Sequence, residues 1–548
     1  MTSDLAPDAA PDAAPGEGAR SGAAIVPDPV LVGRLRADLA DAGYTADAVR
    51  DAWGPLADEA VGHGLHGPAL RALAARAGSS EEVGAEPDAV GVLARLLFLG
   101  VPTAQASVDR VLVRTGSDGL ATLGLAEVRG GEVVPLALVR PQDFDDGDVT
   151  GGAPARSGQW WIASDLDEAA LGGALPVGHV LGVGGASLTL AGLQLPTPAE
   201  RVLDVGTGCG IQALRARRVA DRVVSTDVSP RALAFTRLNA LLNDVDGIET
   251  RLGNLFDPVR GEVFDRVASN PPFVITPRVA GVPAYEYRDA GFAGDDLVAA
   301  FVTGVGGVLA PGGVAQLLGN WEYRGDHDGL DRVREWVDAS PVPLDAWIIE
   351  RELLDPLAYA ELWVRDGGTA PGTPGYGALV EAWLTDFAAR GVTGVGFGYL
   401  LLRRSVSDDG PTLRRFERLT QPIGEAQGGL GVHLARALEA SDVLARLDDD
   451  ALAATVLVVA GDVTEARHHL PGAEAPSVIE LRQGGGFART IEVDPALAAL
   501  VGACDGDLPV GVLIDAIAQL LEVDATALRS ELLPRVRELV FTGFLGVA

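Results

Sequence analysis

The order of apolar and polar residues divides most of the chain into four segments. Apolar residues recur every three or four positions through residues 29–115, which predicts an N-terminal helical domain. Shorter alternating runs predict a β-rich connecting region over residues 116–195. Strand-like and helix-like stretches then alternate through residues 196–407, which favours a parallel α/β sheet. Residues 408–548 lose this regularity and predict a C-terminal α+β domain, with a winged-helix-like form as one option.

The connecting region contains two features that bear on the following domain. The runs 120–128 and 133–139 alternate in polarity around Gly130-Gly131, a pair typical of a tight turn, and predict a β-hairpin. Residues 184–190 carry two glycines followed by apolar residues. We expect this second segment either to wrap over a ligand of the following domain or to form a plain packing helix.

The first 28 residues are rich in alanine, proline and aspartate and contain a single arginine. They lack the apolar stretch of a signal peptide and predict a disordered acidic tail. Elsewhere the longest apolar runs reach about ten residues, whereas a membrane-spanning helix needs roughly 20. We therefore expect no membrane-spanning segment and no membrane partner.

The composition narrows the possible functions. The 548 residues include 43 basic and 76 acidic ones, a formal net charge of −33, so a nucleic-acid partner would need a local basic patch. Two cysteines, Cys209 and Cys504, are too few for a disulfide framework and favour a reducing, cytoplasmic setting. Every basic residue is arginine, which excludes a catalytic lysine, and asparagine occurs only five times.

A glycine-rich turn is the first chemical signal. The apolar run that begins at Arg201 contains Asp204 and leads into Gly206-Thr207-Gly208-Cys209-Gly210, after which a helical pattern starts. Glycines between a strand and a helix let the backbone approach a ligand at the carboxyl edge of a sheet. The spacing differs from the dinucleotide pattern G-x-G-x-x-G, and no phosphate-loop ending follows. A tight turn without a ligand is the alternative.

The ends of two later predicted strands carry residues that are suited to binding a nucleoside. Asp227 and Val228 follow the next apolar run, and Asp227 lies 21 residues after Gly206, where a carboxylate accepts hydrogen bonds from ribose hydroxyls. A helix N-cap is the other interpretation of Asp227. Asn254 and Leu255 follow a third run, where an amide side chain and a backbone N–H could bind an adenine edge. Asn254 could equally cap a turn.

The fourth signal is Asn270-Pro271-Pro272-Phe273, which directly follows the strand-like run 264–269. Two consecutive prolines stiffen a loop at the carboxyl edge of the sheet. A rigid turn with a buried phenylalanine is the alternative to a catalytic loop.

Taken together and in this order, these motifs resemble the class I S-adenosylmethionine-dependent N-methyltransferases that carry the signature [DNS]-P-P-[FYW]. The group includes the protein-glutamine N5-methyltransferases that modify release factors, the N6-adenine methyltransferases, and ribosomal-RNA N2-guanine and N6-adenine enzymes. The resemblance covers about residues 195–405 and implies a Rossmann-like sheet of seven strands. It also implies that S-adenosylmethionine is bound by Asp204, Gly206, Thr207, Gly208, Gly210, Asp227, Val228, Asn254, Leu255 and Asn270.

The chemistry of such enzymes explains the motif. An amide or an exocyclic aromatic amine is a poor nucleophile because its nitrogen lone pair is delocalised. The Asn270 side-chain oxygen and the Pro271 carbonyl can accept hydrogen bonds from an NH2 group and aim its lone pair at a methyl group. Phe273 is expected to stack on the planar group. We therefore take Asn270, Pro271, Pro272 and Phe273 as the catalytic set.

Downstream, Tyr285 and Arg288 lie in a stretch of aromatic residues and glycines that is expected to contact the substrate; a solvated surface loop is the alternative. No metal is expected, because the pairs His63/His66 and His468/His469 lack carboxylate or cysteine partners nearby in the sequence.

The acceptor of the methyl group is a macromolecule in the leading interpretation. Protein glutamine N5 comes first, because an acidic surface would attract a basic translation factor or ribosomal protein. Adenine N6 or guanine N2 of RNA or DNA is the alternative, since phenylalanine in the last motif position is more frequent there. A small-molecule acceptor and a non-catalytic binding scaffold are less favoured. Both flanking regions would serve acceptor recognition.

Overall fold

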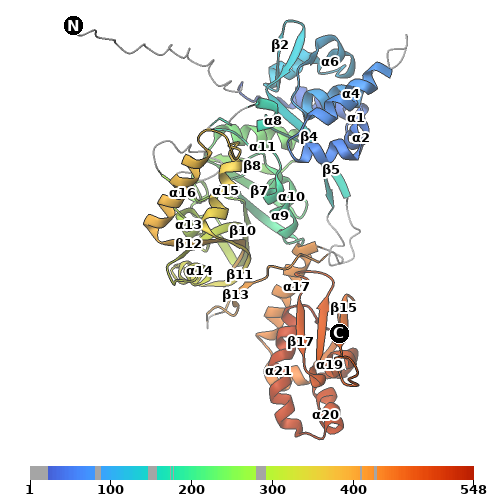
Figure 1. Cartoon of the computed structure of the whole chain (residues 1–548), viewed down its shortest axis with the longest axis vertical. Coiled ribbons are helices and arrows are strands. Elements are labelled where there is room, and N and C mark those ends of the chain that lie inside the picture. The colour runs from blue at the N-terminus through green and yellow to red at the C-terminus, as the bar shows by residue number, and fades with distance from the viewer. Residues whose placement is uncertain are drawn as a thin grey trace, which may run out of the picture.

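The computed structural model describes residues 23–79, 88–145, 157–172, 175–176, 178–278, 292–407, 410–424 and 429–548. The described chain forms three successive bodies: an N-terminal one, a central α/β sheet with its helices, and a C-terminal one that meets the central body near helix α17 (Figure 1).

The N-terminal body begins with helices and continues into short strands. Its elements are α1 (Pro29–Asp41), α2 (Ala46–Trp53), α3 (Pro55–Gly62), α4 (Gly67–Ser79), α5 (Ala89–Leu93), a π-helical turn (Ala94–Phe98), β1 (Thr103–Ala104), α6 (Gln105–Val111), α7 (Gly116–Leu123), β2 (Ala126–Arg129), β3 (Glu132–Pro135), β4 (Ala137–Asp145) and β5 (Ser157–Asp165).

Two expectations for this body need correction. The packed chain begins before residue 29, because Ile25 is buried in the N-terminal core and the Val26 N–H donates to the Leu123 carbonyl at 3.0 Å. The tail predicted over residues 1–28 therefore does not extend through residues 23–28, and residues 1–22 lie outside the described part. Gly130-Gly131 does join two antiparallel strands, β2 and β3. The run 120–128, however, is helical up to residue 123, since Leu120 and Leu123 are both buried on one helix face.

The central sheet has the strand order β8-β7-β6-β9-β10-β12-β11-β13. Pairing is parallel from β8 to β10 and antiparallel on both sides of β12. The strands are β6 (Ala199–Val205), β7 (Ala220–Asp227), β8 (Ile248–Leu252), β9 (Phe264–Ser269), β10 (Leu309–Arg324), β11 (Leu344–Leu354), β12 (Val392–Arg404) and β13 (Arg414–Arg418). From β6 the chain builds outward to β8 and then returns to add β9 on the other side, so the strand order reverses between β6 and β9.

The sheet has eight strands rather than the seven expected, because β13 pairs in parallel with β11. Buried Asp345 holds the returning chain: its carboxylate accepts the N–H groups of Thr412 at 2.6 Å and Leu413 at 3.0 Å, and it pairs with Arg403. The boundary predicted at residue 407 therefore falls before the last strand of the central sheet.

Helices cover both faces of the sheet. Helices α13 (Asp296–Val305) and α14 (Gly329–Asp338) pack on one face. The other face carries α9 (Gly185–Leu193), α10 (Ile211–Ala216) and α11 (Pro230–Leu242), with the N-terminal body packed against α10 and α11. Helix α8 (Glu168–Leu171) and a 3-10 turn (Asp257–Val259) lie in connections. Helices α15 (Pro356–Asp366) and α16 (Tyr376–Arg390), inserted between β11 and β12, pack on Val274 and Ile275.

The C-terminal body is α+β, with two three-stranded antiparallel sheets of order β18-β14-β19 and β15-β16-β17. Its elements are α17 (Gly429–Leu444), α18 (Asp449–Ala453), β14 (Val456–Val459), β15 (Val463–His468), β16 (Val478–Gln483), β17 (Thr490–Val493), α19 (Pro495–Ala503), β18 (Asp505–Pro509), α20 (Val510–Leu521), α21 (Ala525–Phe541) and β19 (Leu545–Val547). Within the described residues, no helix is long and apolar enough to cross a membrane.

Asn239 of α11 joins the N-terminal body to the central one. Its side chain is fully buried, accepts the Ala163 N–H at 2.7 Å, and donates to the carbonyls of Ala163 at 2.9 Å and Cys209 at 2.8 Å. One turn later, Asn243 accepts the Trp161 N–H and donates to its carbonyl, both at 2.8 Å. Two asparagines therefore hydrogen-bond to the backbone of β5 as a neighbouring strand would.

Replacing Asn239 with alanine is expected to destabilise the protein by about 3 kcal/mol, because three buried backbone groups lose their partners. Thermal unfolding followed by circular dichroism should show the midpoint of the first transition lowered by roughly 5–10 °C. The exposed Thr122→Ala change in α7 is the control, with an expected shift within about 1 °C. Equal midpoints for Asn239→Ala and the wild type would contradict this role.

Candidate active site

The glycine turn connects β6 to α10 at the carboxyl edge of the sheet, beside the point where the strand order reverses. In parallel sheets this is where ligands bind. Gly206 and Gly208 have φ values of 71° and 55°, and a Cβ added to either would meet open space. Gly210 serves packing, since a Cβ there would lie 3.0 Å from the side chain of Thr236 on α11. The first two glycines thus expose backbone to a cavity, and the third allows the helix to approach.

Asp204 stabilises this turn through a hydrogen bond with Thr207. It is fully buried and accepts a hydrogen bond from the Thr207 hydroxyl at 2.6 Å. Burial raises the pKa of Asp204 to about 7. Asp204 is absent from the cavity wall, so its predicted contact with a cofactor stays a prediction, while its contact with Thr207 fixes the turn.

Asp227, at the end of β7, holds the turn from the side. One carboxylate oxygen accepts the Gly208 N–H at 3.0 Å, and the other accepts the Ser229 N–H at 2.8 Å. The N-cap of α11 is Ser229, whose hydroxyl accepts the Ala232 N–H, so the interpretation of Asp227 as the helix N-cap is wrong. A carboxylate oxygen can accept more than one hydrogen bond, so these backbone contacts are compatible with the predicted ribose contact, which stays a prediction.

Asn254 and Leu255 follow β8 at the rim of the cavity, which both residues line. The Asn254 residue is exposed, and its backbone carbonyl accepts the Asp257 N–H at 3.0 Å. Leu255 has a φ of 44°, a conformation uncommon for leucine that turns the backbone at this edge. The turn is therefore formed by backbone groups, and contact of Asn254 with an adenine stays a prediction.

Asn270 follows β9, on the other side of the reversal point. Its amide nitrogen donates to the Ser187 hydroxyl of α9 at 3.3 Å. Its side-chain oxygen is buried, and no described residue donates a hydrogen bond to it. A buried acceptor without a donor is costly, by about 1–3 kcal/mol, unless a ligand supplies one. Asn270 therefore presents an unsatisfied oxygen at the cavity that it lines.

The rest of the proline motif divides into two parts. Pro271 and Pro272 line the cavity beside Asn270, whereas Phe273 is absent from its wall. The half-buried Phe273 ring packs on Phe397 of β12, with ring centroids 5.5 Å apart. Stacking of Phe273 on the acceptor stays a prediction.

Tyr285 and Arg288, the predicted substrate contacts, lie outside the described residues.

The cavity has a volume of about 260 Å3. It brings together residues predicted from all four motifs: Gly206, Thr207, Gly208, Asp227, Val228, Asn254, Leu255, Asn270, Pro271 and Pro272. Other wall residues were not predicted, mainly His179, Val180, Leu181, Gly182, Ala186, Ser187, Gln212 and Leu297. Of the sequence features described above, only the run 184–190 with its glycines predicted any of these additional wall residues.

That run lies in helix α9, which packs on the core and also reaches the cavity wall, while wrapping over a ligand stays a prediction. Leu190 and Leu193 pack into the core, while Ala186 and Ser187 line the cavity. The Gln212 amide of α10 donates to the Ser187 carbonyl at 2.7 Å, which fixes the position of the Ser187 hydroxyl facing Asn270.

Ser187→Ala is expected to lower turnover about fivefold, because the Asn270 amide loses the contact that fixes which end faces the cavity. The cofactor Kd should change less than twofold. Initial rates and cofactor titrations of Ser187→Ala and of Thr189→Ala, a control on the same helix, check this. Equal rates for both variants would remove Ser187 from the orientation of Asn270.

Among the described residues at the cavity, the titratable groups provide neither a metal site nor a reactive thiol. Burial raises the pKa of Cys209 to about 11, which keeps the thiol protonated at neutral pH. In the described part of the chain, no group of three or more His, Cys, Asp or Glu side chains is arranged to hold a metal ion.

Comparison with known families assigns the class of the central body. Residues 184–281 match the family model described as methyltransferase small domain. The central body is a class I S-adenosylmethionine-dependent methyltransferase domain, with a Rossmann-like sheet. The flanks match two models, each described as a domain of unknown function: DUF7059 over residues 41–136 and DUF7782 over residues 436–546.

Individual relatives match only part of this chain. The chain is 34% identical over 131 residues to the release factor glutamine methyltransferase of Moorella thermoacetica, across 22% of this chain and 46% of that protein. The corresponding enzyme of Aquifex aeolicus is 42% identical over 84 residues, across 15% and 30%. The ribosomal protein L11 methyltransferase of Symbiobacterium thermophilum is 33% identical over 173 residues, across 30% and 55%. The chain thus spans roughly a third to a half of these relatives.

Among solved structures, the ribosomal protein L11 methylase of Lactobacillus delbrueckii subsp. bulgaricus has a TM-score of 0.24 and 17% identity, over 43% of this chain and 82% of that one.

Proposed function

We propose that this protein transfers a methyl group from S-adenosylmethionine to an amide nitrogen of a protein acceptor, with the glutamine side chain as the leading acceptor group. The observation that carries the proposal is the buried, unsatisfied Asn270 oxygen at the cavity that the glycine turn also lines. An oxygen in this position can accept a hydrogen bond from an NH2 group.

The residues around the cavity fit S-adenosylmethionine. The turn at Gly206 and Gly208 exposes backbone to open space, which suits close approach of a ligand. The Asp227 carboxylate at the end of β7 is suited to ribose hydroxyls, and the edge formed by Asn254 and Leu255 is suited to the adenine ring. When bound, the cofactor supplies a methyl group on a positively charged sulfur.

Asn270 and Pro271 provide the rest of the chemistry. Hydrogen bonds from the acceptor NH2 to the Asn270 oxygen and the Pro271 carbonyl would hold the nitrogen with its lone pair toward the methyl carbon. The new nitrogen–carbon bond forms as the carbon–sulfur bond breaks, and the nitrogen then loses a proton to water. This route uses neither a metal nor a residue with an unusual pKa.

Relatives and charge support a protein acceptor. Two of the relatives are named for glutamine of a release factor and the third for a ribosomal protein. The net charge of −33 favours a basic protein over a polyphosphate. Phenylalanine in the motif favoured nucleic acid, but Phe273 packs on Phe397 instead of lining the cavity, so its identity says less about the acceptor.

Labelling tests this proposal. The purified protein is incubated with methyl-labelled S-adenosylmethionine and an extract of cells that express it, and the products are treated with protease or nuclease. Label removed by protease alone, and recovered as N5-methylglutamine after enzymatic digestion, is the expected result. Label removed only by nuclease would overturn the protein acceptor and favour RNA or DNA.

A further inference from the structure

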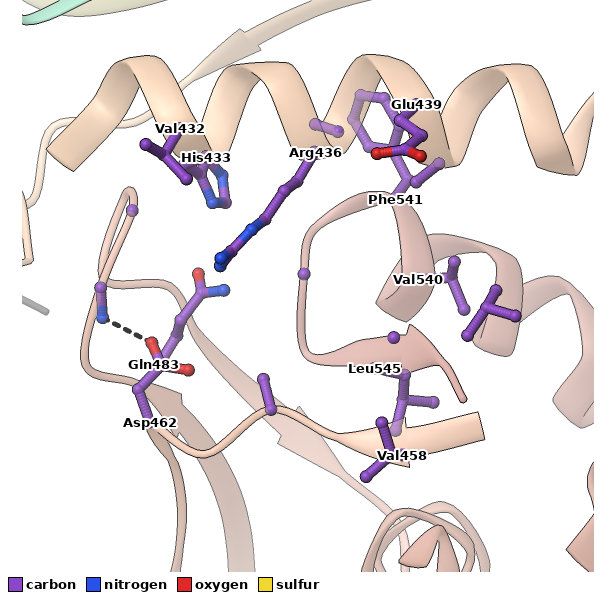
Figure 2. A pocket seen from close by; sticks show the side chains of 18 of the residues that line it. Val432, His433, Arg436, Glu439, Val458, Asp462, Gln483, Val540, Phe541 and Leu545 are labelled. Atoms are coloured by element: carbon purple, nitrogen blue, oxygen red, sulfur yellow. Dashed lines mark hydrogen bonds between the residues drawn. The ribbon is translucent and has the colours of Figure 1, made fainter. Parts of the chain in front are cut away.

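The C-terminal body contains a groove of about 890 Å3, separate from the methyltransferase cavity (Figure 2). Helix α17 forms one side with residues such as Val432, His433 and Arg436. The ends of β14 and α21 and all three residues of β19 form the other side. Nothing in the reaction proposed above uses this groove.

The groove borders a sheet edge that is open. β19 is the outer strand of the order β18-β14-β19. The Phe544 carbonyl accepts the Ala460 N–H at 2.9 Å, and the Ala548 N–H donates to the Val456 carbonyl at 3.1 Å. Because backbone direction alternates along a strand, the N–H and C=O groups of Leu545 and Val547 point away from β14. Across the described residues, no strand pairs with this edge.

Buried polar atoms at the groove also lack partners. Gln483 is 7% exposed, and its amide nitrogen donates to the Thr542 carbonyl at 3.0 Å. Its amide oxygen, like the Nε2 atom of His433, has no hydrogen-bond partner among the described residues. Figure 2 shows the Arg436 side chain pointing from α17 toward the Gln483 amide, with the His433 ring on the same helix. An N–H donor is therefore the group that the Gln483 oxygen needs.

The charged residues that line the groove indicate which side chain a partner would carry. Arg436 is exposed on α17 and forms no ion pair with any described residue. Asp462 and Glu439 also line the groove, and the Asp462 carboxylate accepts the Gly485 N–H at 2.8 Å. A single acidic side chain suits the guanidinium that has no ion-pair partner, whereas the two carboxylates that line the same groove disfavour a polyphosphate.

The narrow end of the groove depends on a glycine. A Cβ at Gly486 would lie 2.5 Å from the His433 ring, so only glycine lets the turn approach α17 so closely. Burial lowers the pKa of His433 to about 4, so the ring is neutral at pH 7.

We propose that this groove binds an extended segment of a protein partner that carries one acidic side chain. The segment adds to β19 as a further strand, its carboxylate pairs with Arg436, and one of its N–H groups donates to the Gln483 oxygen. Main-chain hydrogen bonds to an open edge supply affinity, and side chains on alternate positions supply specificity. This docking site goes beyond methyl transfer and does not depend on the identity of the methyl acceptor.

Peptide binding to the full-length protein tests the proposal. The probe is a fluorescein-labelled peptide, Val-Thr-Val-Asp-Val-Thr-Val, measured by fluorescence anisotropy. The matched peptide with asparagine in place of aspartate should bind about fivefold more weakly, and one with alternate backbone nitrogens methylated should bind more than tenfold more weakly. Absence of saturable binding by the acidic peptide below about 1 mM would overturn the docking site.

Two variants locate the binding. Arg436→Gln should bind the aspartate and asparagine peptides equally, because the guanidinium is gone. Arg446→Gln, an exposed arginine beyond the end of α17, should keep the wild-type preference. An Arg436→Gln protein that retains the preference for aspartate, or a wild type that binds the methylated peptide equally well, would overturn the assignment to this groove.

Discussion

Replacing Asn270 with alanine is expected to lower kcat about 10²- to 10³-fold while the cofactor Kd changes less than threefold. In the proposed mechanism, the Asn270 oxygen accepts a hydrogen bond from the substrate NH2, and without it the nitrogen would lose the contact that aligns its lone pair. In the proposed binding mode, the cofactor contacts mainly residues at the ends of β6, β7 and β8, so its binding energy should be largely retained. Single-turnover rates with the identified acceptor, together with calorimetric titration of S-adenosylhomocysteine, check both parts.

Asn270→Asp separates loss of the hydrogen bond from loss of the fold. A carboxylate still accepts a hydrogen bond, and the Ser187 hydroxyl can turn to donate to it, so this variant should retain at least about tenfold more activity than Asn270→Ala. Unchanged turnover of Asn270→Ala would exclude Asn270 from the mechanism. Equal losses in both variants, with wild-type unfolding midpoints, would show that the contact depends on the amide as a whole.

The parts of the site that could be predicted from sequence share one physical property. Gly206, Asp227 and Asn270 each follow a short apolar run directly, and such runs become parallel strands whose carboxyl ends meet at one edge. For these three residues, a position directly after a strand in the sequence therefore predicts a position at the shared edge of the sheet. The same reasoning located Asn254, whose side chain lies at the rim.

This reasoning does not predict contacts between segments that are far apart in the sequence. Ser187 reaches Asn270 across 83 residues, and nothing in the apolar pattern of α9 indicates which helix face meets the cavity. The direction of Phe273 depends on Phe397, which arrives on β12. Strand β13 was missed because the connection before it is irregular and its pairing depends on buried Asp345, far away in the sequence.

The boundaries of the N-terminal body were missed for a related reason. Ile25 belongs to the short apolar run Ala-Ala-Ile-Val at residues 23–26, which is too short for a periodic pattern, yet Ile25 is buried in the N-terminal core. The asparagines of α11 gave no sequence signal for β5 either, because their bonds go to the backbone of that strand.

Replacing Asp227 with alanine is expected to raise the Kd for S-adenosylhomocysteine about 10²-fold, since hydrogen bonds to a charged carboxylate contribute roughly 1.5–3 kcal/mol each. Asp227 also holds the glycine turn through Gly208 and Ser229, so a raised Kd alone could come from a displaced turn. A second ligand is therefore required to isolate the ribose contact.

The 2′,3′-dideoxy analogue of S-adenosylhomocysteine provides that separation. The wild type should bind the analogue about 10²-fold more weakly than the parent compound, whereas Asp227→Ala should bind the two within about threefold of each other, because its ribose partner is already gone. A displaced turn would weaken both ligands by the same factor and leave their ratio as in the wild type. If Asp227→Ala still discriminates between the two ligands by the wild-type factor, the ribose contact belongs to another residue, and Asp227 serves only to hold the turn.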